Sequence, residues 1–408
     1  MNTKIRLTLM NFLQYAVWGA WLISLGAYLG NTLKFDGLQI GSFFATMGIA
    51  SLFMPAVMGI IADRWIPAQR LLGLCHLFAA GFITLAATRT DYNSLYTLVL
   101  LSVMFYMPTI ALSNSVAYNA LEKAGLDTVT HFPPIRVWGT VGFICAMWVV
   151  DLGKMGLSAT QLYFSATLGL ILGLYSFTLP NCPINRSGGG KSIVDLLGLR
   201  AFALFKQRKM AIFFIFSMLL GMSLQITNAF ADGYIKSFGD TGIHGAKYLG
   251  TFGVKHSTIL ISLSQISETL CILLIPFFLK RFGIKRVMLI AMFAWVLRFA
   301  LLGAGNPGPG VWMFILSMIV YGVAFDFFNI SGSLFVEKET SAAIRSSAQG
   351  VFMIMTNGLG ALIGSYLAGW VVNHYGWPLS WYLFAGFSLV VAIVFAVIFK
   401  YKHDPNRI

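Results

Sequence analysis

The chain alternates between long apolar runs and short polar connections. A membrane-spanning helix needs roughly 20 apolar residues, and twelve runs of about that length are bounded by charges or by Gly, Pro and Asn. Because the runs are continuous, without the alternation of strands in a membrane barrel, they predict helices. The predicted spans are residues 8–30, 39–61, 70–88, 94–120, 135–152, 159–179, 210–235, 256–279, 286–304, 311–335, 345–372 and 379–399.

The longest polar connection, residues 181–209, divides these spans into six and six. It contains a Gly-rich piece, Ser187 to Lys191, of the composition that flexible linkers have. Short basic turns also recur at matching places, at residues 59–70 after the second span and 278–286 after the eighth. Parallel repeats are typical of transporters with a central site between two bundles. We therefore predict six-helix bundles at residues 1–185 and 210–408, joined by a cytoplasmic linker at 186–209.

Composition supports a polytopic, all-α membrane protein with twelve transmembrane helices. Of the 408 residues, 58% are hydrophobic and 10% are charged, against about 25% charged in an ordinary soluble domain. The mean hydropathy is +0.78. A soluble multidomain enzyme is excluded. The first apolar run is too long for the core of a cleaved signal peptide, so it predicts a retained helix.

The net charge is +14, and the positions of the basic residues indicate the orientation of the chain in the membrane. With a cytoplasmic N-terminus, twenty Lys and Arg residues fall in cytoplasmic connections and tails, against six on the other side. Basic residues flank membrane spans on the cytoplasmic side. Both termini are therefore expected in the cytoplasm, and nucleic acid is not expected as a partner.

No motif indicates an enzyme, a metal or an organic cofactor. The four cysteines are far apart and form no C-x-x-C pair, and no H-E-x-x-H sequence occurs. Gly303 to Gly308 fits G-x-G-x-x-G, but it joins two membrane spans and lacks the strand that a dinucleotide site requires. We predict that the protein is not an enzyme.

Ionisable side chains inside a membrane span are costly, so each is a functional candidate. Four stand deep in predicted spans, namely Arg136, Glu268, Arg298 and Asp326. Two are positive and two are negative, so they could neutralise one another. The alternative is that they are paired for purely structural reasons.

Neutral polar and aromatic residues accompany these charges at helical spacing. Gln225 and Asn228 are three residues apart, as are Gln265 and Glu268, so each pair shares a helix face. Amides donate and accept hydrogen bonds at once, as ribose hydroxyls and nucleobase edges require. The remaining candidates, Thr140, Phe143, Tyr321 and Phe325, supply a hydroxyl and aromatic faces on which a base can stack.

Further polar and aromatic positions are weaker candidates. Gln14, Trp18 and Trp21 share one face of the first span and could line the same cavity. For Asn114, Asn329 and Asn357 we expect hydrogen bonds between helices in place of substrate contacts.

Four strings in the chain resemble those of bacterial nucleoside permeases of the nucleoside:proton symporter family, within the major facilitator superfamily. They are Phe132-Pro133-Pro134-Ile135-Arg136-Val137-Trp138-Gly139-Thr140, Leu224-Gln225-Ile226-Thr227-Asn228, Ser264-Gln265-Ile266-Ser267-Glu268 and Tyr321-Gly322-Val323-Ala324-Phe325-Asp326-Phe327-Phe328-Asn329. The resemblance extends over nearly the whole chain. One departure is Trp65, which stands where the superfamily usually has a glycine after Asp63-Arg64.

The resemblance implies a carrier of the bacterial inner membrane that imports nucleosides such as uridine or adenosine with protons by alternating access. It implies substrate contacts at Arg136, Thr140, Phe143, Gln225, Asn228, Gln265, Glu268, Tyr321 and Phe325, and importance for Asp326. The partners implied are nucleoside, protons and the lipid bilayer, with no cofactor and no obligatory protein partner.

A carboxyl group without water around it holds its proton more tightly than one in solution. Either Asp326 or Glu268 could therefore carry the coupling proton, and Asp326 is favoured, with Glu268 contacting substrate. Arg136 or Arg298 would be the charge partner. Two rival functions stay open: a symporter of the same superfamily for a sugar or another small polar solute, and an intramembrane transferase or receptor.

Overall fold

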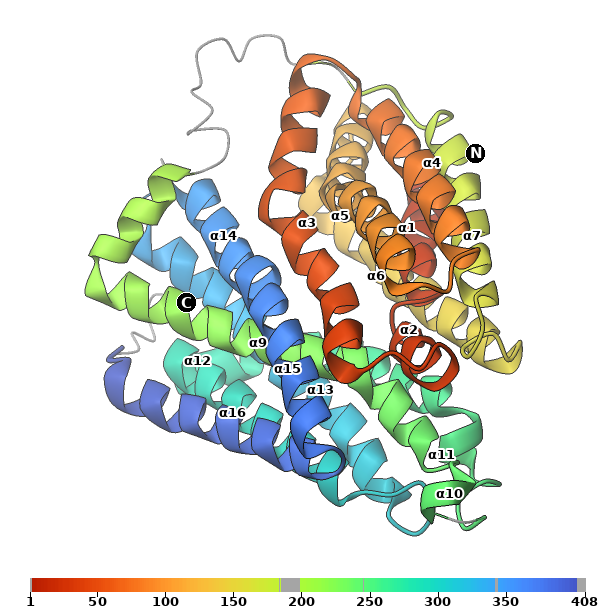
Figure 1. Ribbon diagram of the computed structural model, residues 1–408. Helices are drawn as coiled ribbons and strands as arrows, with labels where there is room; N and C mark the ends of the chain where they lie inside the picture. The colour runs from red at the N-terminus through yellow and green to blue at the C-terminus, as the bar shows by residue number, and fades with distance from the viewer. Residues whose placement is uncertain (1, 183, 185–198, 245, 342–343, 402–408) are drawn as a thin grey trace. The chain divides into compact units, whose positions relative to one another are not determined.

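The computed structural model describes residues 2–182, 184, 199–244, 246–341 and 344–401 (Figure 1). Within this part of the chain all regular secondary structure is helical. The chain forms two compact units, one of residues 1–35 and 46–196 and the other of residues 36–45 and 197–408. The predicted linker lies largely outside the described residues, so the predicted domain boundaries stay a prediction.

The first unit contains the helices before the predicted linker, and α3 begins in the second unit and ends in this one. Helix α1 packs on α6 and α7, and α4 packs on α5 and α7. Its apolar core includes Leu7, Leu72, Val116 and Leu172, which are fully buried. Its elements are α1 (Thr3–Gly19), α2 (Leu25–Ala27), η1 (Tyr28–Thr32), α3 (Gly37–Arg64), α4 (Ala68–Ala87), α5 (Tyr92–Lys123), α6 (Thr128–Leu152) and α7 (Thr160–Ser176).

The second unit is built around the pairing of α12 with α13, and α9 packs on η3 and α15. The first residues of α3 also belong to it, and the Gly37 amide donates to the Asn373 side chain at 2.5 Å. Its elements are η2 (Leu199–Lys206), α9 (Arg208–Ser237), α10 (Thr241–His244), α11 (Phe252–Lys255), α12 (Ser257–Ala304), α13 (Val311–Glu339), α14 (Arg345–Met353), η3 (Ile354–Gly360), α15 (Ala361–Tyr375) and α16 (Leu379–Ile398).

The helices match the twelve predicted spans. Nine described helices are long and apolar enough to cross a membrane. Helix α12 covers two predicted spans. Its backbone turns between them at Gly283, where φ is 75°. Helices α1 and α7, of 17 residues each, account for the remaining two. Side chains such as Leu273 and Val397 are 74% and 70% exposed, as expected for faces that contact lipid.

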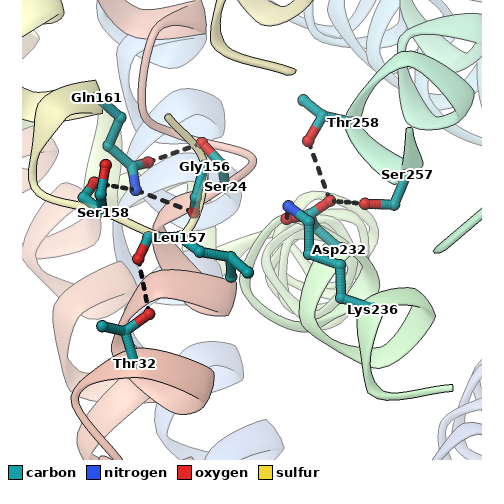
Figure 2. A network of polar contacts seen from close by, with 10 residues as sticks. All are labelled: Ser24, Thr32, Gly156, Leu157, Ser158, Gln161, Asp232, Lys236, Ser257 and Thr258. Atoms are coloured by element: carbon teal, nitrogen blue, oxygen red, sulfur yellow. Dashed lines mark hydrogen bonds and ion pairs between the residues drawn. The ribbon is translucent and has the colours of Figure 1, made fainter. Parts of the chain in front are cut away.

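The first predicted span differs, because it is not one continuous helix. Helix α1 ends at Gly19, and the chain turns before α2 and η1. Side chains secure this irregular segment: the Ser24 hydroxyl donates to Gln161 Oε1 at 2.7 Å, and the Thr32 hydroxyl donates to the Leu157 carbonyl at 2.7 Å (Figure 2). Non-helical backbone at membrane depth requires such internal partners.

Two glycines allow the close helix contacts that position the candidate site. A Cβ atom on Gly142 of α6 would lie 2.1 Å from the Phe12 carbonyl oxygen of α1. In the second unit, a Cβ atom on Gly322 of α13 would lie 2.6 Å from the Ser267 carbonyl oxygen of α12. Any larger residue would separate these backbones. The contacts therefore place Phe143 beside α1, and Tyr321 beside Glu268.

Candidate functional site

In the first unit, the predicted residues of α6 lie against aromatic side chains. The Arg136 guanidinium carbon stands 3.9 Å from the centre of the Tyr15 ring, a cation–π contact. Phe143 is buried and meets Trp18 edge to face, with ring centroids 6.3 Å apart. Thr140 lies on the same helix, one turn beyond Arg136. Arg136 and Phe143 thus lie beside aromatic residues of α1.

Gln14, which was expected as a cavity residue, is the centre of a buried hydrogen-bond network. Its amide nitrogen donates to the Thr109 hydroxyl at 2.7 Å, and its amide oxygen lies 2.8 Å from His76 Nε2. Since an amide oxygen only accepts, His76 Nε2 is the donor. Tyr106 donates to the Gln14 main-chain carbonyl at 2.7 Å and packs on Trp18.

His76 and Tyr106 are absent from the candidates that the sequence suggested. His76 is fully buried within α4 and lines a small cavity of about 290 Å³ with Trp21 and Tyr106. A histidine six residues into the predicted span 70–88 was the signal available in the sequence.

In the second unit, the buried Arg298 is held by neutral groups. Its exposed fraction is 2%. One guanidinium nitrogen donates to the Ser317 main-chain carbonyl at 2.6 Å, and the group lies over the Tyr321 ring, 4.7 Å from its centre. Ser317 in turn donates to the Arg298 carbonyl at 3.1 Å, which fixes α13 against α12. Ion pairing between Arg298 and a carboxylate stays a prediction.

Tyr321 joins the remaining predicted groups of α12 and α13. Its hydroxyl lies close to the Gln265 side chain and within electrostatic range of Glu268 and Asp326. Its ring stacks on Phe325, with planes 5° apart and centroids 5.6 Å apart. The structure therefore brings together the cation, the two acids, the amide and the aromatic pair that the sequence indicated.

The two acids interact with each other. Asp326 is 5% exposed, and its Oδ2 atom has no hydrogen-bond partner within the described part of the protein. Glu268 is half-buried and close enough to Asp326 for direct electrostatic interaction. Two carboxyl groups that share a poorly hydrated site do not readily ionise together. The pair is thus a place where one proton can be held.

Helix α9 carries two of the amides that the sequence indicated, Gln225 and Asn228. Gln225 is buried, and its Oε1 atom has no hydrogen-bond partner in the described structure. Asn228 is half-buried, one turn further along. An amide oxygen buried without a partner is costly, so Gln225 is suited to accept a hydrogen bond from a bound molecule.

Asn329 and Asn357 line a cavity, which differs from the interhelical role expected for them. The cavity has an empty volume of about 280 Å³. Phe325 forms part of its wall, so it adjoins the cluster around Tyr321. The rest of its lining combines aromatic, aliphatic and small residues, namely Trp295, Phe328, Leu220, Leu224, Ala324, Gly221 and Thr356.

A further buried acid, Asp232 of α9, was not among the four expected ionisable groups. It is 1% exposed and is paired with Lys236 at 2.6 Å. It stands three residues before the end of the predicted span 210–235, where a charge is usually interfacial, so its burial was not evident from the sequence. Among the described residues no group of three or more His, Cys, Asp or Glu could hold a metal ion.

A bundle of apolar helices that buries carboxyl, amide and aromatic groups together within its spans defines a membrane transporter for a polar solute. The chain belongs to the nucleoside H+ symporter family, whose model matches residues 1–404. It is therefore a proton-coupled nucleoside transporter and not an enzyme.

Two relatives and one solved structure match almost the whole chain. The nucleoside permease NupG of Escherichia coli is 51% identical over 410 residues, which are 99% of this chain and 97% of that protein. The xanthosine permease of Escherichia coli is 50% identical over 415 residues, 100% of this chain and 98% of that one. A crystal structure of the nucleoside transporter NupG, 51% identical, superposes with a TM-score of 0.92 and covers 98% and 100% of the two chains.

The contribution of the Tyr321 ring to stability can be measured separately from that of its hydroxyl. Tyr321→Phe keeps the face beneath Arg298 and the stack on Phe325, so the unfolding temperature in detergent should change little. Tyr321→Leu removes both, and we expect a loss of roughly 2 kcal/mol, typical of a desolvated cation–π contact. Thermal unfolding of the purified variants measures this, and equal stability of the two would contradict the role given to the ring.

Proposed function

We propose that the protein imports nucleosides, such as uridine and adenosine, together with protons by alternating access across the bacterial inner membrane. The observation that carries this proposal is the buried pair Asp326 and Glu268 beside the stacked rings of Tyr321 and Phe325. The carboxyl pair can bind and release a proton, and the stacked rings offer a flat surface for a nucleobase.

Substrate binding is assigned to the polar and aromatic groups of both units. Gln225, Asn228, Gln265 and Glu268 hydrogen-bond the ribose and the base, since amides and carboxylates together match hydroxyl and base-edge donors and acceptors. Support comes from the partnerless Oε1 atom of Gln225 and from the cavity beside Phe325.

In the first unit, Arg136, Thr140 and Phe143 are assigned to the same ligand. Arg136 is half-buried, and the Tyr15 ring lies beneath its guanidinium. A cation held on one face by an aromatic ring keeps its N–H donors in the plane of the guanidinium, where they can bind ribose hydroxyls.

Proton coupling is assigned to Asp326. Glu268 is assigned to interact both with Asp326 and with the substrate. Asp326 lacks a hydrogen-bond partner on Oδ2, whereas Glu268 is the more accessible of the two acids. A proton on Asp326 removes the repulsion between the carboxyl groups, which leaves Glu268 charged and able to accept hydrogen bonds from nucleoside. Arg298, close to Tyr321, is the cation that this change of charge would affect.

The halves that alternate are proposed to be residues 1–185 and 210–408, joined at the cytoplasmic side. The distribution of Lys and Arg supports this orientation, with twenty basic residues in the connections and tails assigned to the cytoplasm and six in the others.

Loss of an amide on α9 should abolish tight nucleoside uptake. Gln225→Ala and Asn228→Ala should each lower uridine uptake by about tenfold or more, since a site built for hydrogen bonds discriminates strongly when one is lost. Uptake of labelled uridine by cells lacking other nucleoside carriers measures this at equal protein levels. Asn119→Ala is the control, since that amide donates to the Ser115 carbonyl of its own helix. Normal uptake by both α9 variants would contradict the assignment.

Asp326→Asn should separate binding from accumulation. The variant keeps the shape of the side chain but cannot exchange a proton. We expect that it still exchanges labelled for unlabelled uridine across vesicle membranes while it no longer accumulates uridine when an inward proton gradient is imposed. Gradient-driven accumulation at the wild-type level would place the coupling proton elsewhere.

Orientation can be tested with a single cysteine. In a variant without native cysteines, a cysteine at Asn2 should react with a membrane-impermeant maleimide in inverted vesicles and stay unlabelled in intact spheroplasts, because the N-terminus is proposed to be cytoplasmic. A cysteine at Asn93, in the connection assigned to the outside, should show the opposite pattern. Labelling of Asn2Cys in intact spheroplasts would contradict the orientation.

A further inference from the structure

Asp232 is a fully paired carboxylate inside the second unit. Its Oδ2 atom accepts from Lys236 Nζ at 2.6 Å, and its Oδ1 atom accepts from the Ser257 and Thr258 hydroxyls at 2.5 and 3.1 Å (Figure 2). The exposed fractions of Asp232, Ser257 and Thr258 are at most 1%. Both carboxylate oxygens therefore have donors, and no solvent is needed to satisfy them.

These contacts join two helices. Asp232 and Lys236 belong to α9, whereas Ser257 and Thr258 are the first two residues of α12. The first turn of α12 contains no acidic residue of its own, and His256 at its N-cap makes no capping hydrogen bond with its side chain. A carboxylate at this end compensates the partial positive charge of the helix. Asp232 thus supplies the start of α12 with a negative charge from another helix.

The same two helices carry most of the amides assigned to substrate. Gln225 and Asn228 precede Asp232 by seven and four residues, so all three lie on one face of α9 within about 10 Å along the axis. Gln265 follows Thr258 by seven residues on one face of α12, again about 10 Å along the axis. The Asp232 contacts therefore fix the relative register of α9 and α12 one to two turns from these amides.

We propose that Asp232, neutralised by Lys236, is a positioning residue for nucleoside binding. It holds α9 and α12 in the register in which Gln225 and Asn228 of one helix and Gln265 of the other reach the same nucleoside. The inference rests on the proposed function and adds a determinant of affinity that does not touch the substrate.

The test measures KM and Vmax for uridine uptake, together with uridine affinity of the purified protein. Asp232→Ala, and the double variant Ser257→Ala with Thr258→Val, break the link between the helices. We expect KM to rise about tenfold in each with Vmax within about twofold, because a shift in register weakens binding and leaves the transport step intact. Asp232→Asn keeps an oxygen for the two hydroxyls, so its KM should rise less.

Glu339→Gln is the matched control. It breaks the ion pair between Lys209 of α9 and Glu339 of α13, which has the same length of 2.6 Å but is partly exposed. Its KM should equal that of the wild type. Asp232→Ala combined with Lys236→Met removes the acceptor without leaving an uncompensated buried cation, so this variant measures the register effect if Asp232→Ala alone does not fold.

The outcomes separate the two proposals. If Gln225→Ala raises KM but Asp232→Ala and the Ser257 and Thr258 double variant do not, the positioning role is overturned and the nucleoside site stands. A loss confined to Vmax or to the amount of folded protein also overturns it. If Gln225→Ala has no effect, the proposed nucleoside site itself fails.

Discussion

The contact between Arg298 and Tyr321 is the interaction on which the second unit depends. A charged side chain at the centre of a membrane helix costs about 2.5 to 3.5 kcal/mol on insertion scales unless it finds partners. Arg298 finds them in the Ser317 carbonyl and the Tyr321 ring. Both partners belong to α13. The contacts with this one cation therefore hold α13 against α12 and orient the ring that stacks on Phe325.

This arrangement leaves the carboxyl groups available for function. Because neutral groups stabilise Arg298, Asp326 retains an oxygen without a hydrogen-bond partner in the described structure. At Asp232, a further buried acid of this unit, both oxygens are satisfied. The contrast divides the buried acids by role: a carboxylate with a full set of donors positions helices, and one that lacks donors can bind and release a proton.

Much of the architecture follows from the sequence because its cause is local. Hydrophobic length alone locates the twelve spans, and helical spacing alone places Gln225 with Asn228 and Tyr321 with Phe325. The break after Gly19 was not predictable, since it depends on Gln161, which is 137 residues from Ser24 in the chain. Similarly, nothing in an apolar run that contains His76 shows that its partner is Gln14.

Asp232 and the cavity asparagines illustrate the same limit. Whether a charge near the end of a span faces water or another helix depends on tertiary packing, so the sequence did not single out Asp232, which the structure buries. Asn329 and Asn357 have the composition of interhelical contacts, yet they line a cavity beside Phe325. The family match supplies the class of substrate, and the geometry supports the roles proposed for individual residues.

The central claim is that nucleoside binding and protonation of Asp326 are linked. The most direct measurement is the affinity of the purified protein for uridine as a function of pH, by calorimetry in buffers of different ionisation enthalpy. The account predicts that uridine binding changes the number of bound protons in the wild type and that this linkage disappears in Asp326→Asn. Equal proton linkage in the two proteins would contradict it.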